Sequence, residues 1–179
     1  MNSVRISKYL ARILRHDPAG AGIVLDPQGW ASVADVLTAV GRRFGGFGAA
    51  ELTQLVRAND KQRLALSPDG ARIRANQGHS VAIDLGLEPM VPPPLLYHGT
   101  KADRLLSIIR DGLQKGRRTH VHLSADAVTA VRVGSRRPGP VAVLGVRSGD
   151  MQGHAFYCSA NGVWLTDYVP PAYLFDCVR

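Results

Sequence analysis

A proline-rich segment near the middle of the chain limits the fold more than any other stretch. Residues 88–94 read EPMVPPP, and each of these four prolines lacks the backbone N–H that a helix interior or an inner strand needs. Neither kind of element can therefore run through the segment. We predict a domain boundary here, with one small domain over 1–91 and a second over 92–179.

The first domain is expected to combine three helices with a hairpin. Apolar residues at helical spacing predict helices over 4–15, 33–40 and 49–58. Alternating residues on either side of an Asp-Gly pair, in 64–66 and 71–75, predict a β-hairpin. Helices followed by a hairpin give the outline of a winged helix.

The second domain is expected to be rich in strands, so that the whole chain has the α+β fold class. The patterns predict strands at 95–97, 120–124 and 141–146, helices over 101–112 and 125–133, and a hairpin that joins 156–157 to 163–165 through Asn161-Gly162. In the first of these helices we expect Leu105, Ile108 and Ile109 to be buried. Ser124 or Asp126 is expected to cap the second.

The net charge of +8 favours an anionic partner, with nucleic acid considered first and a membrane surface second. The basic residues are dispersed, so charge alone does not name a function. Cys158 and Cys177 have no metal-binding or disulfide-framework spacing and are expected to be reduced thiols. The chain shows no signal peptide or membrane-spanning run, which predicts a cytoplasmic protein without a membrane partner.

Two groups of residues stand out as candidate sites. Alternation in the run from His120 to Ser124 places His120, His122 and Ser124 on one face of a strand. Histidines at this spacing also suit a metal, with His98, His154 or Cys158 as further ligands, but no carboxylate lies nearby in the sequence and we expect no metal.

The second group is cationic and is suited to a phosphate. Arg15 and His16 end the first predicted helix, and Lys61 and Arg63 point to one side if their segment is extended. Taken alone, each pair is also typical of a solvated helix end or strand edge.

Five motifs, taken together, resemble those of the RNA 2'-phosphotransferases of the KptA type, which act on tRNA splice junctions. The motifs are Leu14-Arg15-His16-x-Pro18, Lys61-x-Arg63, His98-Gly99-Thr100, Arg118-x-His120-Val121-His122-Leu123-Ser124 and Phe156-Tyr157-x-Ser159-x-Asn161-Gly162-Val163-Trp164-Leu165. They occur in the family's order and span residues 14–165. The resemblance implies a winged-helix-like lobe followed by an NAD-binding lobe with an ADP-ribosyltransferase-like fold.

The same resemblance implies removal of an internal RNA 2'-phosphate with NAD consumed as co-substrate. The phosphate attacks the nicotinamide ribose and expels nicotinamide, which leaves ADP-ribosylated RNA. The ribose 2''-hydroxyl then attacks phosphorus, and the products are RNA with a 2'-hydroxyl and ADP-ribose 1'',2''-cyclic phosphate. The expected partners are RNA with an internal 2'-phosphate and NAD, and the expected state is a monomer.

Site residues also follow from the resemblance. The implied catalytic residues are Arg15, His16, Arg63 and Arg118, and the implied phosphate-binding residues are Arg15, His16, Lys61 and Arg63. The implied NAD-binding residues are His98, Gly99, Thr100, Gly112, Leu113, His122, Ser124, Ser159 and Asn161. One departure is Leu64, where the family often has an aromatic residue, and we interpret it as a core substitution.

Two alternative functions stay open at this point. One is a non-catalytic winged-helix regulator that binds nucleic acid and senses a small ligand. The other keeps the transferase fold but places ADP-ribose permanently on terminal phosphates of RNA or DNA. A protein-modifying transferase is disfavoured, because the region near Val163 is apolar where such enzymes commonly have a glutamate.

Overall fold

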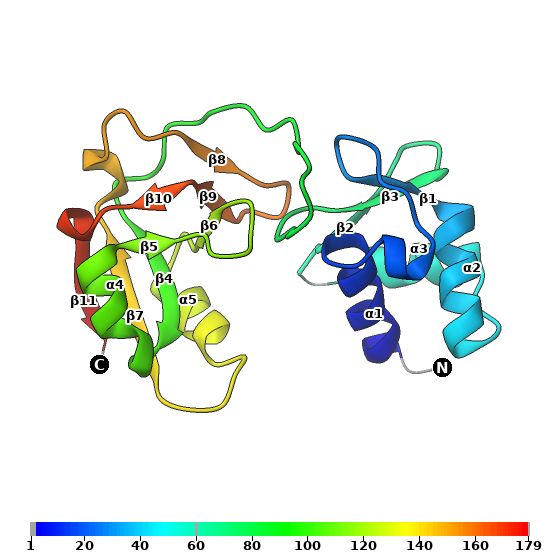
Figure 1. Cartoon of the computed structure of the whole chain (residues 1–179), viewed down its shortest axis with the longest axis horizontal. Helices are drawn as coiled ribbons and strands as arrows, with labels where there is room; N and C mark the ends of the chain where they lie inside the picture. Colours follow the sequence, from blue (N-terminus) through cyan, green and yellow to red (C-terminus); the bar gives the residue numbers. More distant parts are fainter. Residues whose placement is uncertain (1–2, 60, 179) are drawn as a thin grey trace. The chain divides into compact units, whose positions relative to one another are not determined.

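The computed structural model describes residues 3–59 and 61–178, with the side chains of Cys177 and Val178 outside the description. The chain divides into two compact units between Gly86 and Leu87 (Figure 1). Helices and small antiparallel sheets occur in both units, which confirms the α+β class. No helix within the described ranges is long and apolar enough to cross a membrane.

The first unit packs three helices against a three-stranded sheet. The helices are α1 (Ser3–Arg15), α2 (Val33–Phe44) and α3 (Ala49–Arg57), with a short 3-10 turn, η1 (Ala19–Ala21), after α1. The strands β1 (Trp30–Ser32), β2 (Leu64–Leu66) and β3 (Arg72–Ala75) pair antiparallel in the order β1-β3-β2. The helices lie on one side of this sheet (Figure 1).

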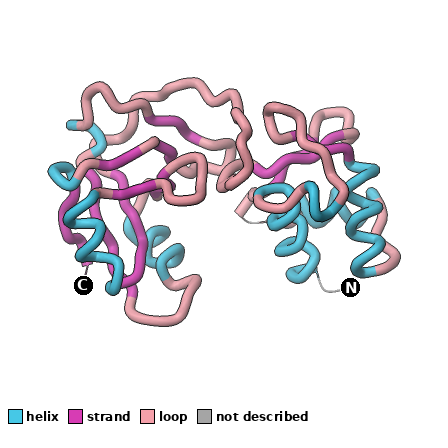
Figure 2. The backbone as a smooth tube through the Cα atoms, in the orientation of Figure 1, coloured by secondary structure: helices cyan, strands magenta, loops and turns pink. Residues whose placement is uncertain are grey.

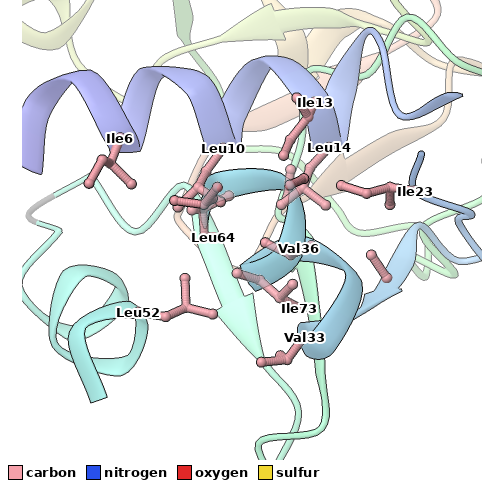
Figure 3. Close-up of a cluster of buried hydrophobic side chains, with 14 residues drawn as sticks. Ile6, Leu10, Ile13, Leu14, Ile23, Val33, Val36, Leu52, Leu64 and Ile73 are labelled. Carbon is pink, nitrogen blue, oxygen red and sulfur yellow. The ribbon is translucent and has the colours of Figure 1, made fainter. Parts of the chain in front are cut away.

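One apolar core holds these elements together. The buried face of α1 contributes Ile6, Leu10, Ile13 and Leu14, which meet Val36, Leu52, Leu64 and Ile73 (Figure 3). Leu64 is only 3% exposed, which confirms that it is a core residue. The predicted hairpin is confirmed, whereas β1 was not predicted and α2 continues past Val40 because Phe44 packs against the same core.

The second unit contains three small sheets. The first has the order β11-β7-β4, from β4 (Leu96–Lys101), β7 (Val141–Val146) and β11 (Leu174–Val178). The second has the order β6-β9-β8, from β6 (Val121–Leu123), β8 (Phe156–Cys158) and β9 (Trp164–Thr166). The third pairs β5 (Leu113–Gln114) with β10 (Tyr168–Val169). A backbone bridge between Tyr97 and Ser124 joins the first two sheets.

The helices of the second unit are short. They are α4 (Leu105–Asp111) and α5 (Ala127–Gly134), with 3-10 turns η2 (Ala102–Arg104), η3 (Ser148–Asp150) and η4 (Pro171–Tyr173). The side chain of Asp126 caps α5, as one of the two predicted options. The Asn161-Gly162 hairpin between β8 and β9 is confirmed. The strands β5, β10 and β11 were not predicted.

Two expectations about the second unit are wrong. The helix predicted over 101–112 begins only at Leu105, since β4 continues to Lys101 by pairing with β7 along its full length. Leu105, Ile108 and Ile109 were expected to be buried, but the first two are only half-buried and Ile109 is 60% exposed, because this short helix lies at the surface.

The proline-rich segment is part of the second unit. No helix or strand occurs between β3 and β4, and this stretch is drawn as a loop in Figure 2. The Met90 N–H donates to the carbonyl of Phe156 at 2.8 Å. The carbonyls of Pro93 and Pro94 accept from the Ser148 hydroxyl and the Gly149 N–H at 2.6 and 3.1 Å. The prolines therefore lie along the surface of that unit and donate nothing to its sheets.

Candidate functional site

In the first unit the end of α1 is tied to a loop that follows the hairpin. The Ser80 N–H donates to the carbonyl of Arg15 at 2.9 Å, and the Ser80 hydroxyl lies 2.9 Å from Nδ1 of His16. Gly78 has a φ of +87°, and a Cβ built there would lie 3.6 Å from a terminal nitrogen of Arg15. The loop thus packs its backbone against the guanidinium and fixes the imidazole.

Arg15 also reaches the start of β2. Its guanidinium donates to the carbonyl of Arg63 at 3.5 Å, and the same carbonyl accepts the Asn76 N–H at 3.0 Å. Arg15, His16 and the backbone of Arg63, three of the four predicted phosphate-binding residues, are thereby held next to one another. We call these three residues with Lys61 the cationic cluster.

The geometry expected for Lys61 and Arg63 is wrong. Their alternation required an extended segment, but Gln62 between them has a φ of +38°, in the left-handed region. The bend is held by two hydrogen bonds, from the Gln62 N–H to the Asn59 carbonyl at 2.8 Å and from the Asn76 amide to the Gln62 carbonyl at 2.5 Å. Lys61 is exposed at this bend.

His79 is a residue that the sequence analysis missed. It is 0% exposed, and among the described residues neither of its ring nitrogens has a hydrogen-bond partner. Burial, the largest cause, and the nearby charges of Arg15, His16 and Arg74 together lower the pKa of His79 to about 4. A neutral imidazole therefore lies beside the guanidinium groups of Arg15 and Arg74 and the imidazole of His16, where a charged one would be repelled. No periodicity in the sequence signals this position.

In the second unit His98 is fixed by the neighbouring strand. Its Nδ1 lies 3.0 Å from the carbonyl of His122, so Nδ1 carries the proton and donates. Burial lowers the pKa of His98, the hydrogen bond to His122 opposes this shift, and the charge of Arg118 adds to it. His98 is therefore neutral, and its Nε2 is an acceptor.

The bridge between Tyr97 and Ser124 sets the direction of the β4 backbone. The N–H and carbonyl of Tyr97 bond Ser124 at 2.9 and 2.8 Å, on the side away from β7. Backbone groups alternate along an antiparallel strand, so the N–H and carbonyl of Gly99 point to that same edge. Thr100, with the opposite parity, points its backbone toward β7.

Arg118 lies in the turn between β5 and β6, where its N–H donates to the Lys115 carbonyl at 3.1 Å. Arg118 is an exposed residue, but partial desolvation of its guanidinium lowers its pKa and the charge of Arg137 adds to the shift. It stays a cation at neutral pH. The alternation predicted for the histidines agrees with β6, where Val121 and Leu123 are buried and His122 has the opposite parity. The His120 ring packs edge to face on Tyr157, with 5.6 Å between centroids.

Ser159 and Asn161 form the turn between β8 and β9. The Ser159 hydroxyl bonds Oδ1 of Asn161 at 2.9 Å and the carbonyl of Val163 at 3.0 Å. Ser159 is 3% exposed, so its hydroxyl holds the hairpin closed. Any contact of this serine with a ligand would compete with these bonds.

Glycine at two of the predicted NAD-binding positions has a packing reason. A Cβ at Gly99 would collide with the carbonyl of Ala130, because α5 lies directly on β4. Gly112 has a φ of +76°, and a Cβ there would collide with the carbonyl of Val169 on β10. Its neighbour Leu113 is buried in the core of the unit, so only the backbone of Leu113 can face a ligand.

The structure ties Arg15 and His16 to one loop of the first unit and His98 to His122 in the second. The convergence of Arg118 with Arg15 and Arg63 stays a prediction, as does a common pocket for the predicted NAD-binding residues. Sequence reasoning also missed Asn76, Gly78 and Ser80, which hold the cationic cluster. Their only signal is the polar run Asn76-Gln77-Gly78-His79-Ser80 directly after a hairpin. In the part of the chain that the structure describes, no group of three or more His, Cys, Asp or Glu residues could hold a metal ion.

Comparison with known proteins gives a consistent result. The family described as "RNA 2'-phosphotransferase, Tpt1 / KptA family" matches residues 1–168. A protein of Agrobacterium fabrum named "Probable RNA 2'-phosphotransferase" is 51% identical over 174 residues, which cover 96% of this chain and 93% of that protein. A protein with the same name from Streptomyces griseus is 50% identical to this chain, and the match covers 96% of this chain and 95% of that protein. Another from Herpetosiphon aurantiacus is 47% identical, and the match covers 96% of this chain and 94% of that protein.

Proposed function

The chain belongs to the RNA 2'-phosphotransferase, Tpt1 / KptA family, and on that premise we propose that it removes an internal 2'-phosphate from RNA with consumption of NAD. The observation that carries the proposal is the grouping of Arg15, His16 and Arg63 around one loop, within a chain whose match to the family extends over residues 1–168. Guanidinium and imidazole groups are the side chains that hold phosphate oxygens best.

The first chemical step requires correct positioning of the phosphate more than it requires a general base. A phosphate dianion is already nucleophilic, and its oxygen attacks the ribose carbon that bears nicotinamide, so that the C–O bond forms as the C–N bond breaks. In this proposal the cationic cluster holds the remaining oxygens of the phosphate. The exposed Lys61 contributes charge at the rim of the cluster rather than a fixed contact.

The second step forms a crowded, highly charged phosphorus centre. The ribose 2''-hydroxyl attacks phosphorus, the bond to the RNA 2'-oxygen breaks, and that oxygen gains a proton. Arg63 and Arg118 would stabilise the charge at phosphorus electrostatically. His16 can move a proton near neutral pH, and its contact with the Ser80 hydroxyl at 2.9 Å holds the ring for that role.

The residues of the second unit fit a bound dinucleotide. A carboxamide such as that of nicotinamide needs one acceptor and one donor, and the Gly99 N–H and carbonyl at the edge of β4 supply such a pair. The neutral His98 adds an acceptor at Nε2 beside this edge. Thr100, His122, Ser124 and the Ser159–Asn161 turn are the further candidates to line the pocket. NAD bound here would supply the ribose carbon to which the phosphate is transferred.

The proposal includes the two lobes that the resemblance implies. Three helices, the β2–β3 hairpin and the added strand β1 support a winged-helix-like first unit. The edge strand β4, joined to β6 through Tyr97 and Ser124, supports an ADP-ribosyltransferase-like second unit. Neither lobe needs a glycine-rich phosphate loop for its part of the reaction.

A defined RNA tests the function. An oligonucleotide with one internal 2'-phosphate, incubated with the protein and NAD, should yield a 2'-hydroxyl, free nicotinamide and ADP-ribose 1'',2''-cyclic phosphate. The matched control is the same RNA with a 3'-terminal phosphate instead. Capped RNA from that control without cyclic phosphate would select the end-capping alternative, and RNA binding without loss of NAD would select the regulator.

A further inference from the structure

The face of the first unit's sheet that is turned away from the helices carries cations that the proposed reaction leaves unused. Ala31, Leu64, Ile73 and Ala75 are buried in the helix-covered core. Residues alternate between the two faces of a sheet, so their neighbours lie on the opposite face. These neighbours are Trp30 and Ser32 on β1, Ala65 on β2, and Arg72 and Arg74 on β3, with Arg63 just before β2.

The register puts the arginines of this face in sequence. Asn76, just after β3, bonds the carbonyl of Arg63 at 3.0 Å, and Arg74 pairs with Ala65. Asn76 is therefore opposite Arg63. On the same face of β3, Arg74 lies two residues before Asn76, and Arg72 lies two residues before Arg74. Ala65 adds only a methyl group beside Arg74, so no large side chain interrupts the series.

Trp30 orients two of these arginines. Its ring lies 4.6 Å from the guanidinium carbon of Arg74 and 5.4 Å from that of Arg72. Arg74 is half-buried, and within the described residues its Nε has no hydrogen-bond partner. Stacking on an indole leaves the terminal N–H groups of a guanidinium free to donate to a ligand.

The charge of this face is positive and is compensated at one position. Arg72 forms an ion pair with Asp26 at 3.5 Å, while its side chain stays 55% exposed. No carboxylate of the described residues pairs with Arg63 or Arg74. A single nucleic-acid strand combines the negative backbone that such a face attracts with bases that stack on guanidinium planes.

We propose that Arg72 and Arg74, oriented by Trp30, bind the RNA strand that continues from the 2'-phosphate held at Arg63. We call this surface the cationic sheet face. Arg72 and Arg74 donate to backbone phosphates, and Trp30 is a positioning residue that acts through them. The inference rests on the proposed function, because the strand that binds this face is the substrate of that reaction.

Two substrates and one matched control separate this role from catalysis. The substrates are a dinucleotide with an internal 2'-phosphate and a 12-nucleotide RNA with the same junction, and the test variant is Arg72→Ala. The control is Arg42→Ala, which removes the same charge from an exposed residue on α2. The ratio of KM for the long RNA to KM for the dinucleotide should rise about tenfold in Arg72→Ala, since one charged hydrogen bond is lost. It should not change in Arg42→Ala.

A binding experiment without NAD tests the inference independently of the reaction. The labelled 12-mer is titrated at several salt concentrations without NAD, and Arg72→Ala should lower the slope of log Kd against log salt by about 0.7, the value for one lost contact with a single strand. Trp30→Phe should retain affinity and Trp30→Leu should lose it. Equal behaviour of Arg72→Ala and Arg42→Ala in both arms would overturn the inference. Failure of the reaction alone would appear as no turnover of either substrate, with the binding difference intact.

Discussion

The first unit gathers long cationic side chains around a loop, whereas the second unit presents backbone groups at the edge of a strand. Arg15, His16 and Arg63 are tied together by bonds to the carbonyls and hydroxyl of their neighbours. In the second unit the candidate donor and acceptor of Gly99 belong to the main chain, and helix α5 rests directly on that glycine.

The difference predicts how each site responds to substitution. A cationic side chain can be removed from the first site while the fold is retained, because the backbone N–H groups of Ser80 and Asn76 still hold the carbonyls of Arg15 and Arg63. The second site cannot be changed at Gly99 without moving α5. The two sites should therefore separate cleanly in experiments that measure activity and stability together.

Removal of an arginine from either unit should give the largest effect on activity. Arg63→Ala and Arg118→Ala should each slow the second step about 100- to 1000-fold, the usual cost of losing one donor to a developing charge. ADP-ribosylated RNA should then accumulate in single-turnover experiments followed by mass spectrometry. Arg117→Ala is the matched control, since Arg117 is adjacent to Arg118 and is exposed as Arg118 is. Unchanged turnover in both Arg63→Ala and Arg118→Ala would contradict the assignment of both residues.

Substitution of Gly99 should destabilise the second unit alone. Gly99→Ala forces a methyl group against the Ala130 carbonyl, and overpacking of this kind costs about 3 kcal/mol. The chain has two tryptophans, Trp30 in the first unit and Trp164 in the second, so variants with one of them replaced by Phe report each unit in urea unfolding. The control is Gly46→Ala, where a Cβ meets nothing within 4 Å. Equal stability of Gly99→Ala and wild type would show that α5 can move away from β4.

Protonation of His79 should make the first unit sensitive to acid. Its pKa is about 4 in the folded chain against an ordinary value of 6.5, so between these values the unfolded chain binds a proton that the folded one does not. Stability is therefore fully present above pH 6.5 and falls as the pH falls, by about 2 kcal/mol at pH 4.5. Urea unfolding followed at Trp30 measures it.

The matched comparison is His79→Gln, which cannot be protonated. His16, Arg15 and Arg74 face His79 and are present in both proteins, so the difference between the two pH profiles isolates the imidazole. Parallel profiles for wild type and His79→Gln would show that the buried ring does not resist protonation.

Patterns that repeat along the chain predicted much of this structure. The helical spacing of Ile6, Leu10, Ile13 and Leu14 predicted α1. The Asp69-Gly70 and Asn161-Gly162 pairs predicted the two hairpins. The short strands β1, β5, β10 and β11 escaped prediction, since two to five residues are too few to show a period and partners distant in sequence define them.

The candidate site residues were chosen from side chains in motifs, and the contacts that hold those residues were not predicted. Arg15, His16 and Arg63 are visible as cations in motifs. The bend at Gln62 and the burial of His79 depend on Asn76 and on the loop that packs against α1, and no local pattern encodes those long-range contacts. The exposure of Ile109 was missed for a related reason, since apolar spacing shows that a helix has a face but not whether another element covers it.

Removal of one helix cap from each unit should give the smallest effect and the finest test of their independence. The Asp126 side chain accepts from the Thr129 N–H at 2.7 Å at the start of α5, and the Ser32 hydroxyl accepts from the Asp35 N–H at 3.4 Å at the start of α2. Loss of a cap lowers the free energy of unfolding by about 1 kcal/mol. Loss of the shorter bond to a charged acceptor should lower it more, so Asp126→Ala should be more destabilising than Ser32→Ala. Each loss should appear only at the tryptophan of its own unit. A shift of both tryptophan transitions by either substitution would show that the two units unfold together, and the separate sensitivities expected for Gly99 and His79 would then have to be measured as one transition.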